Sequence, residues 1–177
     1  MKYGKRLINK RDTFTEIFNR TKRKIFNFVL KMTSDRMLAE DITQNIFMKF
    51  FESLDYIKDL QSVEFWLFKT ARNEVYQVYR RKKIHVDQYG VDDIDNVELE
   101  SGESPQDSLE QKDLKQIIDS QLESMPAEQK EVYLLKEYGG FSYHEIALML
   151  GTDEDLVKSR LHKARQKLIK RISKLIN

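Results

Sequence analysis

Cysteine is absent from this chain of 177 residues, so neither a disulfide framework nor a thiolate metal site can form. The three histidines, His85, His144 and His162, stand far apart in the sequence and lack the spacing of metal ligands, so no metal and no cofactor is expected. The sequence also lacks a nucleophile–base pair and a glycine-rich phosphate loop. These absences argue against an enzyme and against a small-molecule substrate.

Proline and glycine are rare, with two and six copies, which favours long helices. No apolar run approaches the roughly 18 residues of a membrane span. The basic N-terminus is not followed by the apolar stretch of a signal peptide, so we expect a cytoplasmic protein. Because 40% of the residues are hydrophobic but 34% are charged, the core should be modest or divided.

The net charge of +2 conceals a strong segregation of charge along the chain. Residues 1–36 carry eleven Lys or Arg and three acids, residues 84–113 carry ten acids and one Lys, and residues 157–177 carry eight Lys or Arg and no acid. Two basic blocks separated by an acidic one suggest a polyanionic partner that is contacted at two places. Solvated helix faces joined by an acidic linker explain the charges equally well, so charge alone leaves both interpretations open.

The acidic stretch of residues 84–111 divides the chain. It contains Gly90, Gly102 and Pro105 and has no sustained helical period, so we expect a flexible linker. The sequence therefore predicts an all-α protein with two small helical domains, residues 1–83 and 112–177. Apolar periodicity predicts helices near residues 11–33, 36–55, 62–83, 109–123, 126–138, 143–150 and 154–175. Gly139 and Gly140, which accept positive φ angles, should end one of these helices.

The stretch from Ser142 to Leu168 has the features of a DNA-binding helix-turn-helix. Ser142 and Glu145 have the spacing of a capping box, which starts a short helix. Gly151 suits the left-handed residue of a tight turn, and Asp153 can cap the next helix. In this motif the second helix enters the major groove of DNA. A plain helical hairpin with a solvated basic face is the alternative.

On a helical wheel, the second helix of this motif separates an apolar stripe from a polar face. The buried stripe is expected to comprise Val157, Leu161, Ala164 and Leu168. The polar face mixes hydrogen-bonding side chains for base edges with cations for phosphates. The predicted DNA contacts are Lys158, Ser159, Arg160, His162, Lys163 and Arg165. The acids Glu154 and Asp155 suit a helix N-terminus, but they count slightly against DNA binding because they would lie near phosphates.

Two helices of the N-terminal part carry polar faces opposite their apolar sides. In the helix of residues 36–55, this face comprises Asp41, Gln44, Asn45, Met48 and Glu52. It fits a docking surface, although the pattern alone favours a solvated surface. In the helix of residues 62–83, the outward residues are Trp66, Lys69, Asn73, Gln77 and Arg80, followed by Arg81. An aromatic residue beside cations suits contact with unstacked bases, but packing of Trp66 under a neighbouring segment fits the pattern as well.

Together these motifs resemble the extracytoplasmic-function (ECF) group of bacterial sigma factors, the small promoter-recognition subunits of RNA polymerase. AEDITQNIFMKFF (Ala39–Phe51) resembles the helix that docks on core polymerase, and FWLFKTARNEVYQVYRR (Phe65–Arg81) resembles the promoter-melting and −10 recognition helix. Residues Leu122–Arg165 resemble the −35 recognition domain. The three motifs occur in the family's order and cover nearly the whole chain. The resemblance therefore implies a sigma factor that directs promoter recognition, DNA melting and transcription initiation.

The resemblance also implies roles for residues of the N-terminal part. Asp41, Gln44 and Asn45 match positions that dock on the clamp helices of the largest polymerase subunit. Trp66 matches an aromatic residue at the upstream edge of the transcription bubble. Asn73 matches a family asparagine near the flipped −10 base. The segment Leu54–Glu64 matches the loop that captures this base, whose extrusion costs a few kcal/mol.

For the C-terminal part, the resemblance implies that Lys158, Ser159, His162 and Lys163 read the −35 element. The implied partners are core RNA polymerase, through its clamp helices and flap, promoter DNA, and an anti-sigma factor. We expect no further domain after Asn177 and regulation by that separate partner. The chain departs from the family pattern at three positions, Asn45, Asp153 and Leu156, where Glu, Ser and Thr are usual. A stand-alone regulator of a two-fold symmetric operator is the alternative, but two unlike contact elements in one chain favour a sigma factor.

Overall fold

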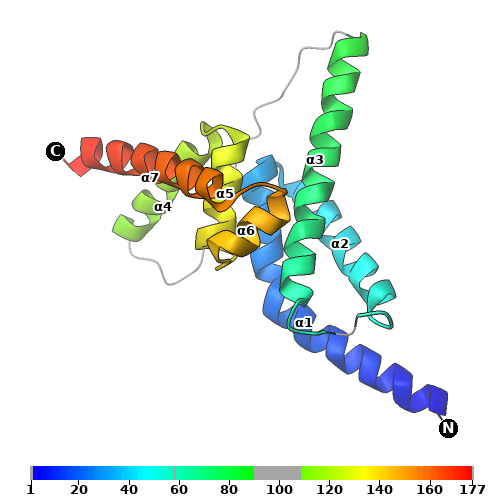
Figure 1. Ribbon diagram of the computed structural model, residues 1–177. Coiled ribbons are helices and arrows are strands. Elements are labelled where there is room, and N and C mark those ends of the chain that lie inside the picture. The colour runs from blue at the N-terminus through cyan, green and yellow to red at the C-terminus, as the bar shows by residue number, and fades with distance from the viewer. Residues whose placement is uncertain (1, 58, 90–108, 177) are drawn as a thin grey trace. The chain divides into compact units, whose positions relative to one another are not determined.

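Helices are the only regular structure in the described part of the chain. The computed structural model describes residues 2–57, 59–89 and 109–176. Seven α-helices and no strand occur within these residues, which confirms the all-α prediction (Figure 1). The chain divides into two compact units, Met1–Ile94 with α1–α3 and Asp95–Asn177 with α4–α7, which we call the N-terminal unit and the C-terminal unit.

The described residues contain neither a membrane-spanning helix nor a metal-binding cluster. None of their helices combines the length and the apolar character needed to cross a bilayer. Their His, Asp and Glu side chains form no group of three that could hold a metal ion. The central part of the expected linker, residues 90–108, lies outside the described ranges.

The N-terminal unit is a bundle of three helices that all contact one another. The helices are α1 (Lys2–Thr33), α2 (Arg36–Ser53) and α3 (Val63–Tyr89). Each contributes one fully buried phenylalanine to the core, namely Phe28, Phe50 and Phe68. The rings of Phe28 and Phe68 meet edge to face, with centroids 5.4 Å apart, a geometry that adds to the stabilisation from apolar burial.

Two helices of this unit extend beyond the limits that periodicity predicts. α1 begins at Lys2 and not near residue 11, and α3 continues to Tyr89 and not to residue 83. The α1 extension contains four Lys or Arg, which have good helix propensity. The α3 extension, residues 84–89, contains none and shows no sustained helical period, so its pattern predicts no helix. Adding residues to an existing helix also avoids the cost of nucleation.

The C-terminal unit places its longest helix against the other three. Its elements are α4 (Leu109–Glu123), α5 (Ala127–Glu137), α6 (Tyr143–Leu150) and α7 (Glu154–Ile176), and α7 contacts each of the others. The predicted apolar stripe of α7, Val157, Leu161, Ala164 and Leu168, is buried, as expected. Leu134 and Ile146 complete this core from α5 and α6. The burial of one face of α7 leaves its opposite face exposed to solvent.

The turn from α5 to α6 uses two adjacent glycines for different reasons. Gly140 adopts φ +73° and thus suits a residue without a Cβ atom. Gly139 does not adopt a positive φ. Its role is close approach, because a Cβ atom there would lie 2.6 Å from the Leu135 carbonyl oxygen and 2.7 Å from the Phe141 ring.

Candidate nucleic-acid interface

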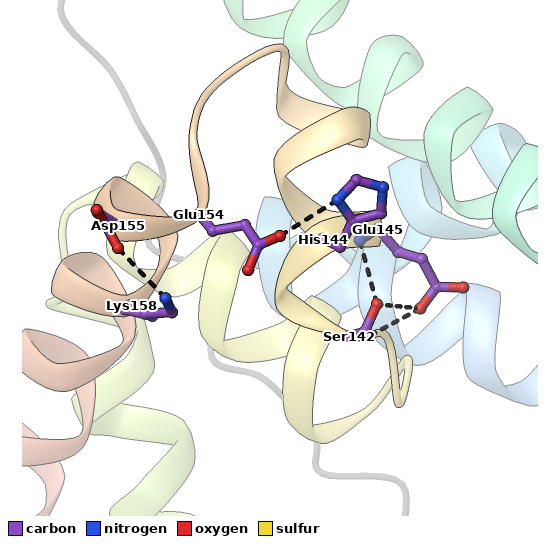
Figure 2. A network of polar contacts seen from close by, with 6 residues as sticks. All are labelled: Ser142, His144, Glu145, Glu154, Asp155 and Lys158. Carbon is purple, nitrogen blue, oxygen red and sulfur yellow. Dashed lines mark hydrogen bonds and ion pairs between the residues drawn. The ribbon is translucent and has the colours of Figure 1, made fainter.

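A capping box starts α6, as the sequence predicts. The Ser142 side chain accepts a hydrogen bond from the Glu145 backbone N–H, with a distance of 3.2 Å, and the Glu145 carboxylate accepts one from the Ser142 backbone N–H at 2.8 Å (Figure 2). The Glu145 carboxylate also accepts a hydrogen bond from the Ser142 hydroxyl at 2.8 Å. The backbone and hydroxyl bonds from Ser142 favour the charged carboxylate, so they lower the pKa of Glu145. The box thus provides partners for the N–H groups of Ser142 and Glu145 at the start of α6.

The turn between α6 and α7 also has the predicted geometry. Gly151 adopts the left-handed conformation, with φ 67° and ψ 40°, and its N–H donates to the Ala147 carbonyl oxygen. Asp153 Oδ1 accepts a hydrogen bond from the Leu156 N–H at 2.7 Å and caps α7. The described residues therefore confirm the predicted helix-turn-helix, in which α6 supports α7.

The acids that open α7 have partners within the motif. Figure 2 shows Glu154 facing His144 of α6, with Oε1 3.2 Å from Nδ1, and Asp155 beside Lys158, with Oδ1 3.2 Å from Nζ. The His144–Glu154 contact joins the two helices of the motif. Asp155 stays highly exposed, with 93% of its side chain accessible. The sequence alone does not reveal the partner of Glu154, which is ten positions away.

The predicted DNA contacts on α7 fall into two groups. Ser159, His162 and Lys163 are exposed, and in the described part of the chain no hydrogen bond or ion pair holds them. Lys158 is exposed too, next to Asp155. Arg160 and Arg165 instead form ion pairs with α5. This partnership is a feature that sequence reasoning missed, because periodicity describes one helix at a time.

The predicted polar face of α2 is exposed, and it borders a groove that the sequence analysis missed. Asp41, Gln44, Asn45 and Met48 all lie on the surface, and 56% of Met48 is accessible. The groove has a volume of about 570 Å³. Its lining from α1 and α2 comprises Phe14, Phe18, Lys22, Phe26, Glu40, Thr43, Gln44, Phe47, Met48, Phe51 and Glu52. The spacing of the three α1 phenylalanines at four and eight residues was a detectable signal, since it places them on one helix face.

On α3, the predicted outward residues differ in exposure. Lys69, Asn73, Arg80 and Arg81 are exposed, whereas Trp66 and Gln77 are half-buried. The Trp66 ring packs against Phe50 of α2, with ring centroids 6.2 Å apart. The packing alternative for Trp66 is therefore correct in part, because one side of the ring contacts α2 while the residue keeps some accessible surface.

Two ion pairs to α1 flank the segment that links α2 to α3. Lys10–Asp55, at 2.7 Å, lies within the segment, and Lys24–Glu64, at 2.6 Å, reaches the first turn of α3. Between them, Asp59 accepts a hydrogen bond from the Gln61 N–H at 2.9 Å. Tyr56 is 83% exposed in this segment. An exposed aromatic ring on such a connected loop is suited to stacking with a base.

Comparison with known proteins connects these features to one family. The sequence matches the family model for sigma-70 region 2 over residues 17–84 and that for sigma-70 region 4 over residues 115–168. The ECF RNA polymerase sigma factor SigM of Bacillus subtilis is 30% identical over 159 residues, which cover 88% of this chain and 93% of that protein. The chain belongs to the ECF sigma factors. As a member of this family, it is a promoter-recognition sigma factor for RNA polymerase.

Further relatives of this ECF sigma factor cover both units. The ECF RNA polymerase sigma-E factor of Escherichia coli is 28% identical over 149 residues, which cover 77% of this chain and 74% of that one. The solved structure of the sigma factor RpoE in complex with the anti-sigma factor NepR from Bartonella quintana superposes with a TM-score of 0.76 and 26% identity, covering 90% of this chain and 96% of that chain. CnrH, solved with the cytosolic domain of CnrY, has a TM-score of 0.59 at 18% identity and supports the fold alone.

Proposed function

We propose that the exposed face of α7 reads the −35 element of the promoter. Ser159, His162 and Lys163 support this role, because they lie exposed on the second helix of a well-formed helix-turn-helix. Their side chains suit hydrogen bonds to base edges, and Lys158 beside them suits a phosphate contact. The ion pairs of Arg160 and Arg165 leave these two arginines less available to DNA.

The exposed face of α3 is proposed to contact the −10 element and to hold the promoter open. Its cations suit phosphates, and Asn73 suits a base edge. The accessible part of Trp66 and the exposed ring of Tyr56 suit stacking on unpaired bases. The proposed −10 contacts on α3 are Trp66, Lys69, Asn73, Gln77, Arg80 and Arg81. This face and that of α7 belong to different units, so one chain can contact two promoter elements.

The exposed face of α2 is proposed to dock on the clamp helices of the largest polymerase subunit. Asp41, Gln44, Asn45 and Met48 form this face. Gln44 and Met48 also line the groove against α1, so a partner helix on this face can place apolar side chains in the groove. The C-terminal unit is proposed to contact the polymerase flap.

An anti-sigma factor is proposed as a further partner, because the Bartonella quintana relative was solved in complex with one. Sigma factors are transcription initiation factors without enzymatic activity. We therefore propose that core polymerase synthesises RNA and that this chain recognises the promoter. Both act in the cytoplasm. The observation that carries the whole function is the occurrence of regions 2 and 4 in one chain, each with an exposed polar and basic face.

Capture of bacterial core RNA polymerase tests the docking face directly. The wild-type chain should retain core polymerase in stoichiometric amount, and Asp41→Arg/Gln44→Ala should abolish retention. Glu16→Arg is the matched control, since it reverses an exposed acid of α1 outside the proposed face and should retain polymerase normally. Equal capture by all three proteins would reject this face. No capture by the wild type, with tight binding to a palindromic duplex, would reject the sigma function itself.

A further inference from the structure

Arg160 and Arg165 differ from the other cations of α7 because each is paired with α5. Arg160 Nη2 lies 2.7 Å from Glu128 Oε2, and Arg165 Nη2 lies 2.6 Å from Glu137 Oε1. The partners are 32 and 28 positions away in the sequence. The two contacts therefore connect separate helices and do not stabilise α7 from within.

The two pairs are well separated along both helices. Glu128 lies in the first turn of α5, and Glu137 is its last residue. At 1.5 Å of rise per residue, these acids are about 13.5 Å apart along α5, and the two arginines are about 7.5 Å apart along α7. A single contact between two helices leaves a pivot, whereas two separated contacts oppose rotation about it. The pairs thus favour one orientation of α7 relative to α5, and this orientation decides which side chains face a DNA groove.

The surroundings of the arginines do not favour a contact with DNA phosphates. Only 21% of the Arg160 side chain is accessible, whereas 46% of the Arg165 side chain is. The hydrogen bond to Glu137 raises the pKa of Arg165, as expected when a carboxylate stabilises the guanidinium charge. If either arginine bound a phosphate through its remaining N–H groups, its carboxylate partner would place a negative charge close to the DNA.

We propose that Arg160 and Arg165 are positioning residues of the recognition helix, which act through Glu128 and Glu137 and do not bind DNA. The inference rests on the proposed role of α7 in −35 recognition. It assigns contact with DNA to Lys158, Ser159, His162 and Lys163, and orientation of these residues to the α5 pairs. Exposed ion pairs contribute little to global stability, so the effect should be visible in recognition at temperatures where all variants are folded.

The first step of the test provides the DNA probe. Holoenzyme formed from this chain and bacterial core RNA polymerase is used to select duplexes from a library randomised in the −35 region. Enrichment of one sequence supports the proposed function, and this duplex and a scrambled version of it are the probes. No enrichment would overturn the proposed function, and this inference with it, before any variant of the ion pairs is measured.

The second step measures whether Glu128 and Glu137 raise or lower the affinity of the holoenzyme for the selected duplex. In Glu128→Gln/Glu137→Gln holoenzyme, affinity for the selected duplex should fall about five-fold, as expected for loss of two exposed ion pairs. The slope of log affinity against log salt should not change, because no phosphate contact is lost. Glu123→Gln removes an exposed acid of α4 and is the matched control. A rise in affinity of the double variant above this control would mean that the acids restrain arginines that bind DNA, which overturns the proposal.

The third step reverses one pair. Arg160→Gln should lose discrimination between the selected and the scrambled duplex, at a temperature where circular dichroism shows full helicity. Arg160→Glu/Glu128→Arg keeps the net charge and rebuilds the contact, so it should restore the discrimination. If Arg160 binds a phosphate, Arg160→Glu/Glu128→Arg places a carboxylate next to that phosphate. It would then bind more weakly than Arg160→Gln, and the salt slope of Arg160→Gln would be lower by about 0.9 than that of the wild type. That pair of results would overturn the inference.

Discussion

In the proposed recognition of the −35 element, single residues of α7 have different roles. Ser159, His162 and Lys163 are exposed and have no partner in the described part of the chain, so they can exchange water for DNA without breaking a contact within the protein. Asp155 is exposed next to Lys158, and its carboxylate would repel DNA phosphates close to it. The side chains that are available, and not the total basic charge of the helix, should therefore decide which bases are preferred.

Replacement of Lys163 tests this view at one position. Lys163→Ala should relax discrimination at a single −35 base pair by about 1–3 kcal/mol, if the ammonium group donates to a base edge. Competition binding of holoenzyme to duplexes altered one base pair at a time measures the effect. Lys170→Ala removes another exposed lysine of α7 and serves as the control. A loss that is uniform across all duplexes would instead identify Lys163 as a phosphate contact.

Replacement of Trp66 tests the role of its accessible surface. Trp66→Ala should leave capture of core polymerase near normal but impair promoter opening, because the stacking surface for an unpaired base is lost. Permanganate reactivity of bubble thymines measures opening. Trp66→Phe keeps an aromatic ring against Phe50 and should lose less reactivity. Reactivity of Trp66→Ala equal to that of the wild type would exclude Trp66 from melting.

At the scale of elements, α6 and α7 are joined by a turn that is bounded by local hydrogen bonds. The capping box starts α6, Gly151 ends it, and Asp153 caps α7. His144 then contacts Glu154 across the turn (Figure 2). These few local contacts thus determine the direction in which α7 leaves the turn. For this reason α6 can support α7 although it has only eight residues.

The capping box predicts a dependence of stability on pH. The folded protein lowers the pKa of Glu145 below its ordinary value of 4.5, so the stabilising effect is complete above that value and is lost as the pH falls through the lower folded pKa. The difference in thermal midpoint between wild type and Glu145→Gln, favouring wild type at pH 7, should therefore shrink below pH 4.5. Thermal melts from pH 7 to pH 3 measure it. A difference that stays constant over this range would contradict the assignment.

At the scale of the whole molecule, two units each have an apolar core of their own. Phe28, Phe50 and Phe68 are fully buried in the N-terminal unit, and Leu134, Ile146 and Leu161 are fully buried in the C-terminal unit. A defect in one core should therefore be felt mainly in that unit. This organisation suits a protein whose two ends contact different promoter elements.

A substitution in one core tests this independence. Leu161→Ala should destabilise the C-terminal unit by about 2–5 kcal/mol, because it leaves a cavity. Trp66 is the sole tryptophan and lies in the N-terminal unit, so its fluorescence reports that unit alone. Denaturant unfolding followed by circular dichroism should show an early phase in the variant, while the fluorescence midpoint stays unchanged. A matching shift of the fluorescence midpoint would mean that the two units unfold together.

The sequence by itself determined the elements and the motif. The helix-turn-helix caps, the buried stripe of α7 and the exposed face of α2 follow from signals that act over a few neighbouring residues, and they agree with the structure. The extensions of α1 and α3 could not be predicted in this way, because they depend on the helix already formed beside them.

Only the tertiary structure decided which side chains meet. The pairing of Arg160 and Arg165 with α5, the packing of Trp66 on Phe50 and the groove between α1 and α2 join residues that are far apart in the sequence. A helical wheel shows in which direction a side chain points from the helix axis, but not which neighbouring helix it contacts. That neighbour depends on how the apolar faces pack, and packing depends on all elements of a unit together.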